Sequence, residues 1–257
     1  MTSRERFLKT MRYEKTDRVP YFEEGIREDV INAWRKQGLT KTAELSEMFS
    51  TDRREEIETD LDPRPELKKW PASRNELDVL RKSLDPDDSR RLPQKWSQRV
   101  RSWRSRDHML MLRVHRGFFL SMGVYGWDRF SEVIRLLIKD PKFIREALAI
   151  RGEFAARMAE RVLAEVDVDA AVFSEPIGGN DRPLLSPQMY EELVLTSYQP
   201  VLDVLNRYGI ETIILRTFAN TRILIPSILK WGFNCLWACE VNIEAMDYRN
   251  LRREFGP

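Results

Sequence analysis

Apolar and polar positions in the last third of the chain switch repeatedly between strand-like alternation and helical spacing. Short apolar runs predict three strands, at Asp169–Glu175, Glu211–Phe218 and Asn234–Glu240. Helical spacing predicts the helices that follow them, at 186–209, 221–230 and 246–255. Apolar strands joined through helices are typical of a parallel sheet that is covered on both faces. The pattern therefore predicts an α/β fold.

The N-terminal part of the chain carries weaker signals. Thr2 and Glu5 form a capping box at the start of a helix, and a short strand is predicted at Val19–Glu24. Residues 40–107 are rich in proline and charge. We expect them to form an irregular insertion of helices and loops around one strand near Glu56–Leu61.

Regular periodicity returns at residue 108. The run HMLMLRVHRGFF at 108–119 predicts a strand, and 127–138 predicts a helix. Asp140 followed by Pro141 is a strong start signal for the next helix, because Asp caps and Pro suits the first helical position. Together the patterns predict about six strands in one domain that spans residues 1–257.

Composition narrows the classes of partner. Lys and Arg total 43 against 41 Asp and Glu, so a net charge of +2 indicates no dedicated polyanion-binding protein. The arginine-rich run Arg90–Arg106 is predicted to be a solvated helix whose tryptophans pack inward rather than a nucleic-acid site. No apolar run is long enough to cross a membrane. Cys235 and Cys239 are too few for a disulfide framework, so we expect a cytoplasmic protein.

Four segments carry a resemblance to a known family. They read SRERFLKTMRYEKTDRVPYF, FSEPIGGNDRPLLSPQMYEELVLTSYQP, IILRTFANTRILIPSILKWGFN and CLWACEVNIEAMDYRNLRREFG. In this order they resemble the uroporphyrinogen decarboxylase superfamily, which includes the zinc-dependent corrinoid and coenzyme M methyltransferases. The resemblance implies a (β/α)₈ TIM barrel with an N-terminal helical cap region and an active-site cleft at the carboxyl ends of the strands. With about six of eight strands, the barrel is expected to be incomplete.

The chain departs from the family at two places. The decarboxylases carry an arginine-rich loop after the first strand, where this chain has Glu23-Glu24-Gly25-Ile26-Arg27. The methyltransferases carry His-x-Cys zinc ligands where this chain has Arg216 and Phe218, and neither side chain binds zinc.

Two carboxylates are the candidate catalytic residues. Strand alternation places Glu175 on one face with Ala171 and Phe173. If that face lines the barrel, Glu175 reaches the cleft as an acid, base or ligand. Alternatively, it is a strand-end carboxylate that caps a neighbouring loop. Glu23 is the second candidate, as the inward member of the acidic pair that ends the first predicted strand.

Basic and polar strand ends form the candidate substrate-binding set. Arg216 in an apolar strand must meet an anion, either a substrate group or the carboxylate of Glu175 or Glu240. Arg113 and His115 alternate onto one face, which fits anion recognition with a proton shuttle or a salt-bridge cluster at the rim. Glu240, at the end of the last predicted strand, and Asn220 complete the set.

The last predicted strand bears on metal binding. If Glu240 points into the cleft, alternation turns Cys235 and Cys239 towards the helices as core residues. His108 and His115 are the only histidines, so no metal site is predicted.

The resemblance implies cofactor-free decarboxylation of the acetate side chains of a tetrapyrrole or a related carboxylated substrate. One alternative is a corrinoid-dependent methyltransferase, which would use zinc and a corrinoid. Another is a non-catalytic tetrapyrrole-binding homologue. A small molecule is the expected partner, and a homodimer paired through the exposed sheet edges is an option.

Overall fold

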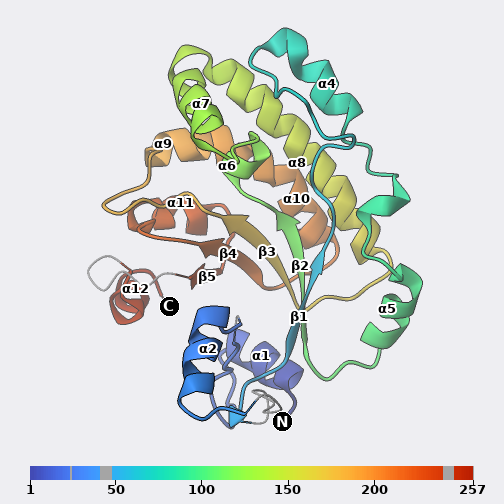
Figure 1. Cartoon of the computed structure of the whole chain (residues 1–257), viewed down its shortest axis with the longest axis vertical. Helices are drawn as coiled ribbons and strands as arrows, with labels where there is room; N and C mark the ends of the chain where they lie inside the picture. Colours follow the sequence, from blue (N-terminus) through green and yellow to red (C-terminus); the bar gives the residue numbers. More distant parts are fainter. Residues whose placement is uncertain (24, 41–47, 240–245, 257) are drawn as a thin grey trace.

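A five-stranded parallel sheet forms the centre of the protein (Figure 1). The structure, a computed structural model, describes residues 1–23, 25–40, 48–239 and 246–256. Within these ranges the strands are β1 (Arg54–Glu58), β2 (Met109–His115), β3 (Ala170–Glu175), β4 (Ile213–Thr217) and β5 (Cys235–Ala238). They neighbour one another in chain order. The predicted α/β class is therefore confirmed.

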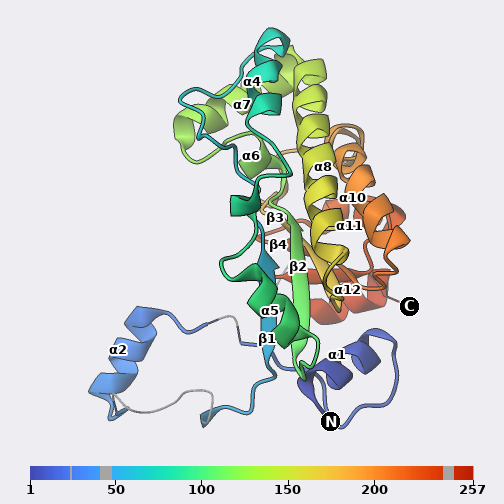
Figure 2. The same ribbon diagram turned by 90° about the vertical axis from the view of Figure 1, so that its right-hand side faces the viewer.

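Helices connect and flank the strands. They are α1 (Ser3–Met11), α2 (Glu28–Lys36), α4 (Leu77–Lys82), α5 (Trp96–Trp103), α6 (Phe118–Ser121), α7 (Trp127–Lys139), α8 (Pro141–Leu163), α9 (Pro187–Met189), α10 (Thr196–Arg207), α11 (Ile225–Lys230) and α12 (Tyr248–Phe255). The capping box at Thr2 and the Asp140 cap of α8 form as predicted. In Figure 2, α2 projects away from the sheet, and none of its residues is buried.

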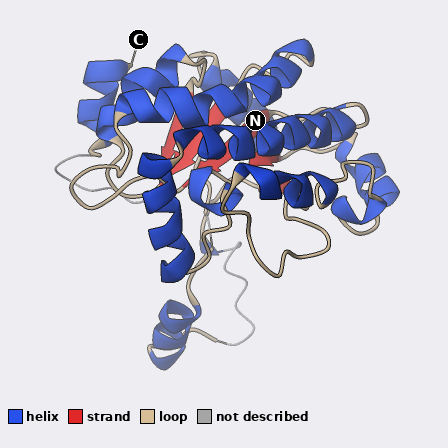
Figure 3. Cartoon of the chain, turned by 90° about the horizontal axis from the view of Figure 1, so that it is seen from above, coloured by secondary structure: helices blue, strands red, loops and turns tan. Residues whose placement is uncertain are grey.

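One face of the sheet packs against the connecting helices; we call it the helix face. Its strand residues include Ile57, Leu112, Phe173 and Leu215, and they share a core with α5, α8, α10 and α11. Figure 3 shows the molecule from above, with helices lying over the strands. Because strand order follows chain order, successive crossovers of one hand place their helices on the same side. The connecting helices therefore lie on one face, while on the opposite face α1 covers the first residues of the strands, where Phe7 packs with Met109 and Met111.

The opposite face is strongly curled, and we call it the concave face. Arg54 of β1 lies over the ring of Trp237 of β5, with 4.7 Å between guanidinium carbon and ring centroid. Strands in a flat sheet are about 4.8 Å apart, so four steps would separate β1 from β5 by about 19 Å. Side-chain contact across this span requires the sheet to bend towards its own concave side.

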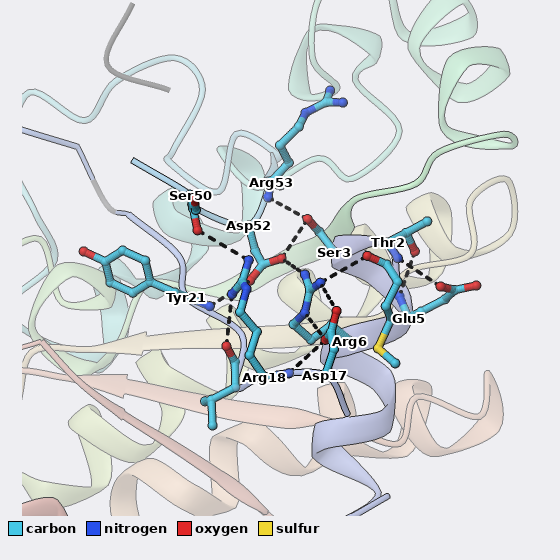
Figure 4. Close-up of polar contacts among 12 residues, drawn as sticks. Thr2, Ser3, Glu5, Arg6, Asp17, Arg18, Tyr21, Ser50, Asp52 and Arg53 are labelled. Carbon is cyan, nitrogen blue, oxygen red and sulfur yellow. Dashed lines mark hydrogen bonds and ion pairs between the residues drawn. The ribbon is translucent and has the colours of Figure 1, made fainter. Parts of the chain in front are cut away.

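Helix α1 closes the amino ends of the strands. Phe7 packs on the first residues of β2 and β3, and Arg4 Nε lies 2.8 Å from Asp169, just before β3. Arg6 and Arg18 both bind Asp52, just before β1 (Figure 4). This end of the sheet is therefore held by a structural ion-pair network.

The strand predicted at Val19–Glu24 is not present in the described part, residues 19–23. This segment is tied to the loop before β1 instead: the Tyr21 N–H donates to Asp52 Oδ2, and the Asp52 N–H donates to the Tyr21 carbonyl. Pro20 also lacks the N–H that a ladder needs. Five strands are described where about six were expected.

Candidate functional site

Charged side chains gather on the concave face, from Arg54 at the amino end of β1 to Glu58 at its carboxyl end. Ile57 enters the core of the helix face, so alternation along β1 turns Arg54, Glu56 and Glu58 to the concave face. The same alternation brings one residue each from β2, β4 and β5. We call the set the concave-face cluster; it comprises Arg54, Glu56, Glu58, Arg113, Arg216 and Trp237.

Glu56 is the centre of this cluster. Arg216 Nη1 donates to Glu56 Oε2 at 2.9 Å, and Arg216 Nη2 donates to Glu56 Oε1 at 3.2 Å. The two side chains therefore form a bidentate ion pair. Arg113 Nε lies 3.7 Å from Glu56 Oε1, and Arg113 Nη2 lies 2.5 Å from Glu58. The side chains of Arg216 and Glu56 are only 14% and 13% exposed. Two guanidinium groups therefore converge on one half-buried carboxylate.

Trp237 supplies an aromatic wall to the cluster. Its ring is flanked by the guanidinium groups of Arg54 and Arg216, whose carbons lie 4.7 and 5.3 Å from the ring centroid. Such contacts are worth about 0.5–2 kcal/mol each. Arg54 Nε is buried and has no hydrogen-bond partner among the described residues. The cluster therefore combines positive charge with a flat apolar surface.

A groove of about 610 Å³ adjoins the cluster on the concave face. Arg54 and Trp237 belong to both the groove and the cluster. Its other walls are mainly apolar and include Phe7, Met11 and Phe22 from the N-terminal region, with Met111 and Ile214 from the sheet. Small-molecule sites commonly pair an apolar cleft with a few convergent polar groups. The groove and the cluster together have that character.

Glu175 lies on the helix face and is fully buried. Its Oε1 accepts a hydrogen bond from the Phe118 N–H at 2.9 Å, and its Oε2 accepts from the hydroxyls of Tyr190 and Tyr198. Burial raises the pKa of Glu175 to about 7, although these three donors oppose the rise. The face expected to line the cleft is thus the one that packs against the helices. The contacts of Glu175 match the alternative interpretation, in which a carboxylate at the end of a strand caps a neighbouring segment, here the one after β2.

His115 and Arg113 do not share a face, contrary to the expectation from alternation. The register between β2 and β3 shifts at this point, so His115 turns to the helix face, where it stacks on Phe173 and contacts the tilted ring of Tyr198. The Gly117 N–H donates to His115 Nδ1 at 3.0 Å. Burial, aided by the charge of Arg151, lowers the pKa of His115 to about 3. The ring is therefore neutral and remote from the concave-face cluster.

The remaining predicted site residues lie in loops. Glu23 is exposed in an irregular segment, and its Oε1 accepts from the Gly25 N–H at 3.2 Å. The side-chain amide of Asn220 donates to the carbonyl of Asp181 at 2.6 Å, which ties the loop after β4 to the loop after β3. Glu240 lies outside the described residues. The structure joins Arg113 and Arg216 through Glu56, but it does not bring the predicted set together.

Cys235 lies on the concave face, which is the reverse of the arrangement expected if Glu240 pointed into the cleft. Cys235 and Trp237 point to the concave face, while Leu236 and Ala238 pack on the other side. Burial raises the pKa of Cys235 to about 11, so its thiol stays protonated at neutral pH. Within the described ranges, no three His, Cys, Asp or Glu side chains form a group that could hold a metal ion.

Arg54, Glu56, Glu58 and Trp237 are the members of the concave-face cluster that sequence reasoning missed. The strand REEIE at 54–58 has a single apolar residue, so its hydrophobic signal is weak. The available clue was Ile57 between the charged residues Glu56 and Glu58, because this pattern is typical of a strand with one polar and one apolar face.

Comparisons with known proteins match this chain to no family model, no curated protein and no solved structure. None of the described helices is both long and apolar enough to cross a membrane.

Proposed function

We propose that the protein is a (β/α)₈-barrel-type carboxy-lyase of the uroporphyrinogen decarboxylase kind, acting in the cytoplasm on a carboxylated tetrapyrrole or a related molecule. The strand order and the curl of the sheet support the barrel type, because strands of such barrels follow one another with helices only outside. In these folds the chemistry lies at the carboxyl ends of the strands. Glu58, Arg113 and Arg216 of the concave-face cluster lie in the carboxyl-terminal halves of their strands.

The observation that carries the proposal is the convergence of Arg113 and Arg216 on Glu56. A guanidinium fork recognises a carboxylate through two parallel hydrogen bonds. Glu56 occupies that position in the free protein. A substrate carboxylate would take its place, with the flat ring of the substrate against Trp237 and the apolar groove.

The displaced Glu56 would serve as the acid and base. In the reaction that the resemblance implies, a pyrrole carbon takes up a proton, and the ring becomes an electron sink. The bond between the acetate carboxylate and its methylene carbon then breaks and releases carbon dioxide, while the electron pair moves into the ring. The methylene carbon takes up a proton to become a methyl group, and the ring returns its first proton. Each transfer needs a group such as Glu56 within hydrogen-bond reach.

The first test is binding and turnover with a tetrapyrrole. We expect uroporphyrin to quench tryptophan fluorescence, and we expect uroporphyrinogen to lose carboxylates, measured by chromatography of the oxidised products. Arg216→Gln should weaken binding about ten- to hundredfold, because it removes a charge-assisted pair. Arg216→Lys keeps the charge but loses the fork and should give an intermediate affinity.

Arg53→Gln is the matched control, because Arg53 is 73% exposed and lies at the amino end of β1. Its affinity should equal that of the unmodified protein. Equal affinity of all variants, or no binding at all, would contradict the proposal.

A non-catalytic tetrapyrrole-binding protein is the second candidate. The observation that favours it is the position of the predicted acids: Glu175 is fully buried on the helix face, and Glu23 is exposed in a loop. Binding that depends on Arg216, without loss of any carboxylate, would favour this candidate. Methyl transfer is less favoured, because Arg216 stands at a zinc-ligand position of that branch.

A further inference from the structure

Arg54 is the one arginine of the concave-face cluster without an anionic partner among the described residues. Its guanidinium lies over the ring of Trp237, but its buried Nε has no hydrogen-bond partner there, and no ion pair to Arg54 is formed in the described ranges. The other two arginines of the cluster are paired with its two glutamates. Three arginines against two glutamates leave the cluster with one positive charge in excess. A half-buried donor without a partner is costly, and an anionic ligand would satisfy it.

Arg54 is also the one charged residue among the described residues that line the apolar groove of about 610 Å³. Val19 and Tyr21 in the wall of this groove are 75% and 54% exposed, so apolar surface is left uncovered there. Uncovered apolar surface in a groove is typical of a binding site. The groove therefore offers one cation beside a long stretch of apolar surface.

A second hollow of about 530 Å³, bordered by α11 and α12, adjoins the groove. The two hollows share the lining residues Thr10, Met11, Cys235, Leu236 and Tyr248. The side chains that line only the second hollow are mainly apolar and include Ile225, Ile228, Leu229, Leu251 and Phe255. Arg252 at its border is exposed and donates to the Tyr13 hydroxyl at 3.3 Å. Together the hollows form an apolar path that begins at one half-buried arginine.

We propose that this path binds an elongated apolar monocarboxylate, such as a medium-chain fatty acid, with its carboxylate on Arg54 and its chain along the two hollows. A guanidinium offers a carboxylate two parallel N–H donors, and the chain leaves water for apolar surface. One excess positive charge matches one carboxylate. Arg113 and Arg216 keep their bonds to Glu56, so the inference does not depend on the proposed function, although both ligands would contact Trp237.

Isothermal titration with decanoate, below the concentration at which it forms micelles, tests the site. We expect one decanoate per chain. Decan-1-ol has the same chain without the charge and should bind about ten- to hundredfold more weakly, because it loses the charge-assisted contact. Acetate, which has the head group alone, should give no measurable heat. Each methylene group added between hexanoate and decanoate should tighten binding about two- to fourfold.

Arg54→Met keeps an unbranched side chain and removes the charge. It should weaken decanoate binding about ten- to hundredfold and leave decan-1-ol binding nearly unchanged, because only the head-group contact is lost. Arg53→Met is the matched control: Arg53 is the neighbour in sequence, its side chain is 73% exposed, and it pairs with Asp107. This control should bind both ligands as the unmodified protein does.

Equal affinity for decanoate and decan-1-ol, an equal loss in both arginine variants, or affinity that does not change with chain length would overturn the proposal. If Arg54→Met does not fold, the comparison of the ligands on the unmodified protein still decides. No decanoate binding, together with a dimer that Met11→Glu dissociates in light scattering, would assign the groove to a second copy of the chain instead.

Discussion

Burial decides the protonation of individual residues on the helix face. Glu175 and His115 lie at the ends of neighbouring strands, both are buried, and both contact Tyr198. Burial disfavours the charged form of each group, so it moves their pKa values in opposite directions. Each side chain is therefore neutral over part of the pH range in which the same side chain would be charged in water.

These shifts predict a pH dependence that single substitutions uncover. The pKa of Glu175 rises from 4.5 to about 7, so its contribution to stability is full below pH 4.5 and is lost as pH rises through 7. The pKa of His115 falls from 6.5 to about 3, so its contribution is full above pH 6.5 and is lost as pH falls through 3. Between pH 4.5 and 6.5 the two slopes cancel.

Urea unfolding at several pH values between 4.5 and 6.5 measures how the free energy of unfolding changes with pH. In Glu175→Gln, the free energy of unfolding should rise with pH by up to about 1.4 kcal/mol per unit, because only His115 remains. In His115→Phe it should fall by a similar amount. The same slope in both variants would show that these groups do not titrate as described.

At the scale of elements, α8 and α10 approach each other through a glycine. A Cβ added to Gly152 of α8 would lie 1.9 Å from the carbonyl oxygen of Ser197 in α10, which is far too close. A glycine inside a helix usually lowers the stability of that helix. The packing instead requires a residue without a side chain, because the backbones of the two helices nearly touch.

Gly152→Ala should therefore destabilise the protein in spite of a better helix propensity. Propensity favours alanine by about 1 kcal/mol, while overpacking costs about 1–3 kcal/mol or more where backbone must move. We expect a net loss of about 1–2 kcal/mol in the free energy of unfolding, measured with urea. Ala149→Gly, at an exposed position of the same helix, reports the propensity change alone. A more stable Gly152→Ala protein would refute the close approach.

At the scale of the whole molecule, the sheet has two edges. In the described ranges β1 pairs only with β2, and β5 pairs only with β4, so each leaves one side of its backbone unpaired. Unpaired strand edges are surfaces for association with another chain. The concave-face cluster joins β1 to β5 through Arg54 and Trp237, so it also holds the two edges towards each other.

We expect the protein to form a homodimer through these edges. Light scattering at increasing protein concentration should show the dimer, and amide hydrogen exchange in β1 and β5 should slow as it forms. Exchange in β3, which is paired on both sides, serves as the internal reference. A monomer at every concentration, with unchanged exchange at both edges, would rule this out.

Local signals were sufficient to predict most elements. Helix α8 begins at its Asp140–Pro141 signal, and β3 and β4 fall within their predicted ranges, because caps and periodicity act between residues close in sequence. The segment 19–23 was predicted as strand and is irregular, since Asp52 binds it from a distant position.

The sequence by itself determined the α/β class, the strands β2 to β5, the main helices and the arginines that must meet an anion. Only the tertiary structure decided which face of each strand is buried under helices, and hence that Glu175 and His115 leave the concave face. It also decided the partner of Arg216, since Glu56 lies 160 residues away. Alternation sorts residues onto two faces, but the packing of distant elements decides which face is covered and which charges meet.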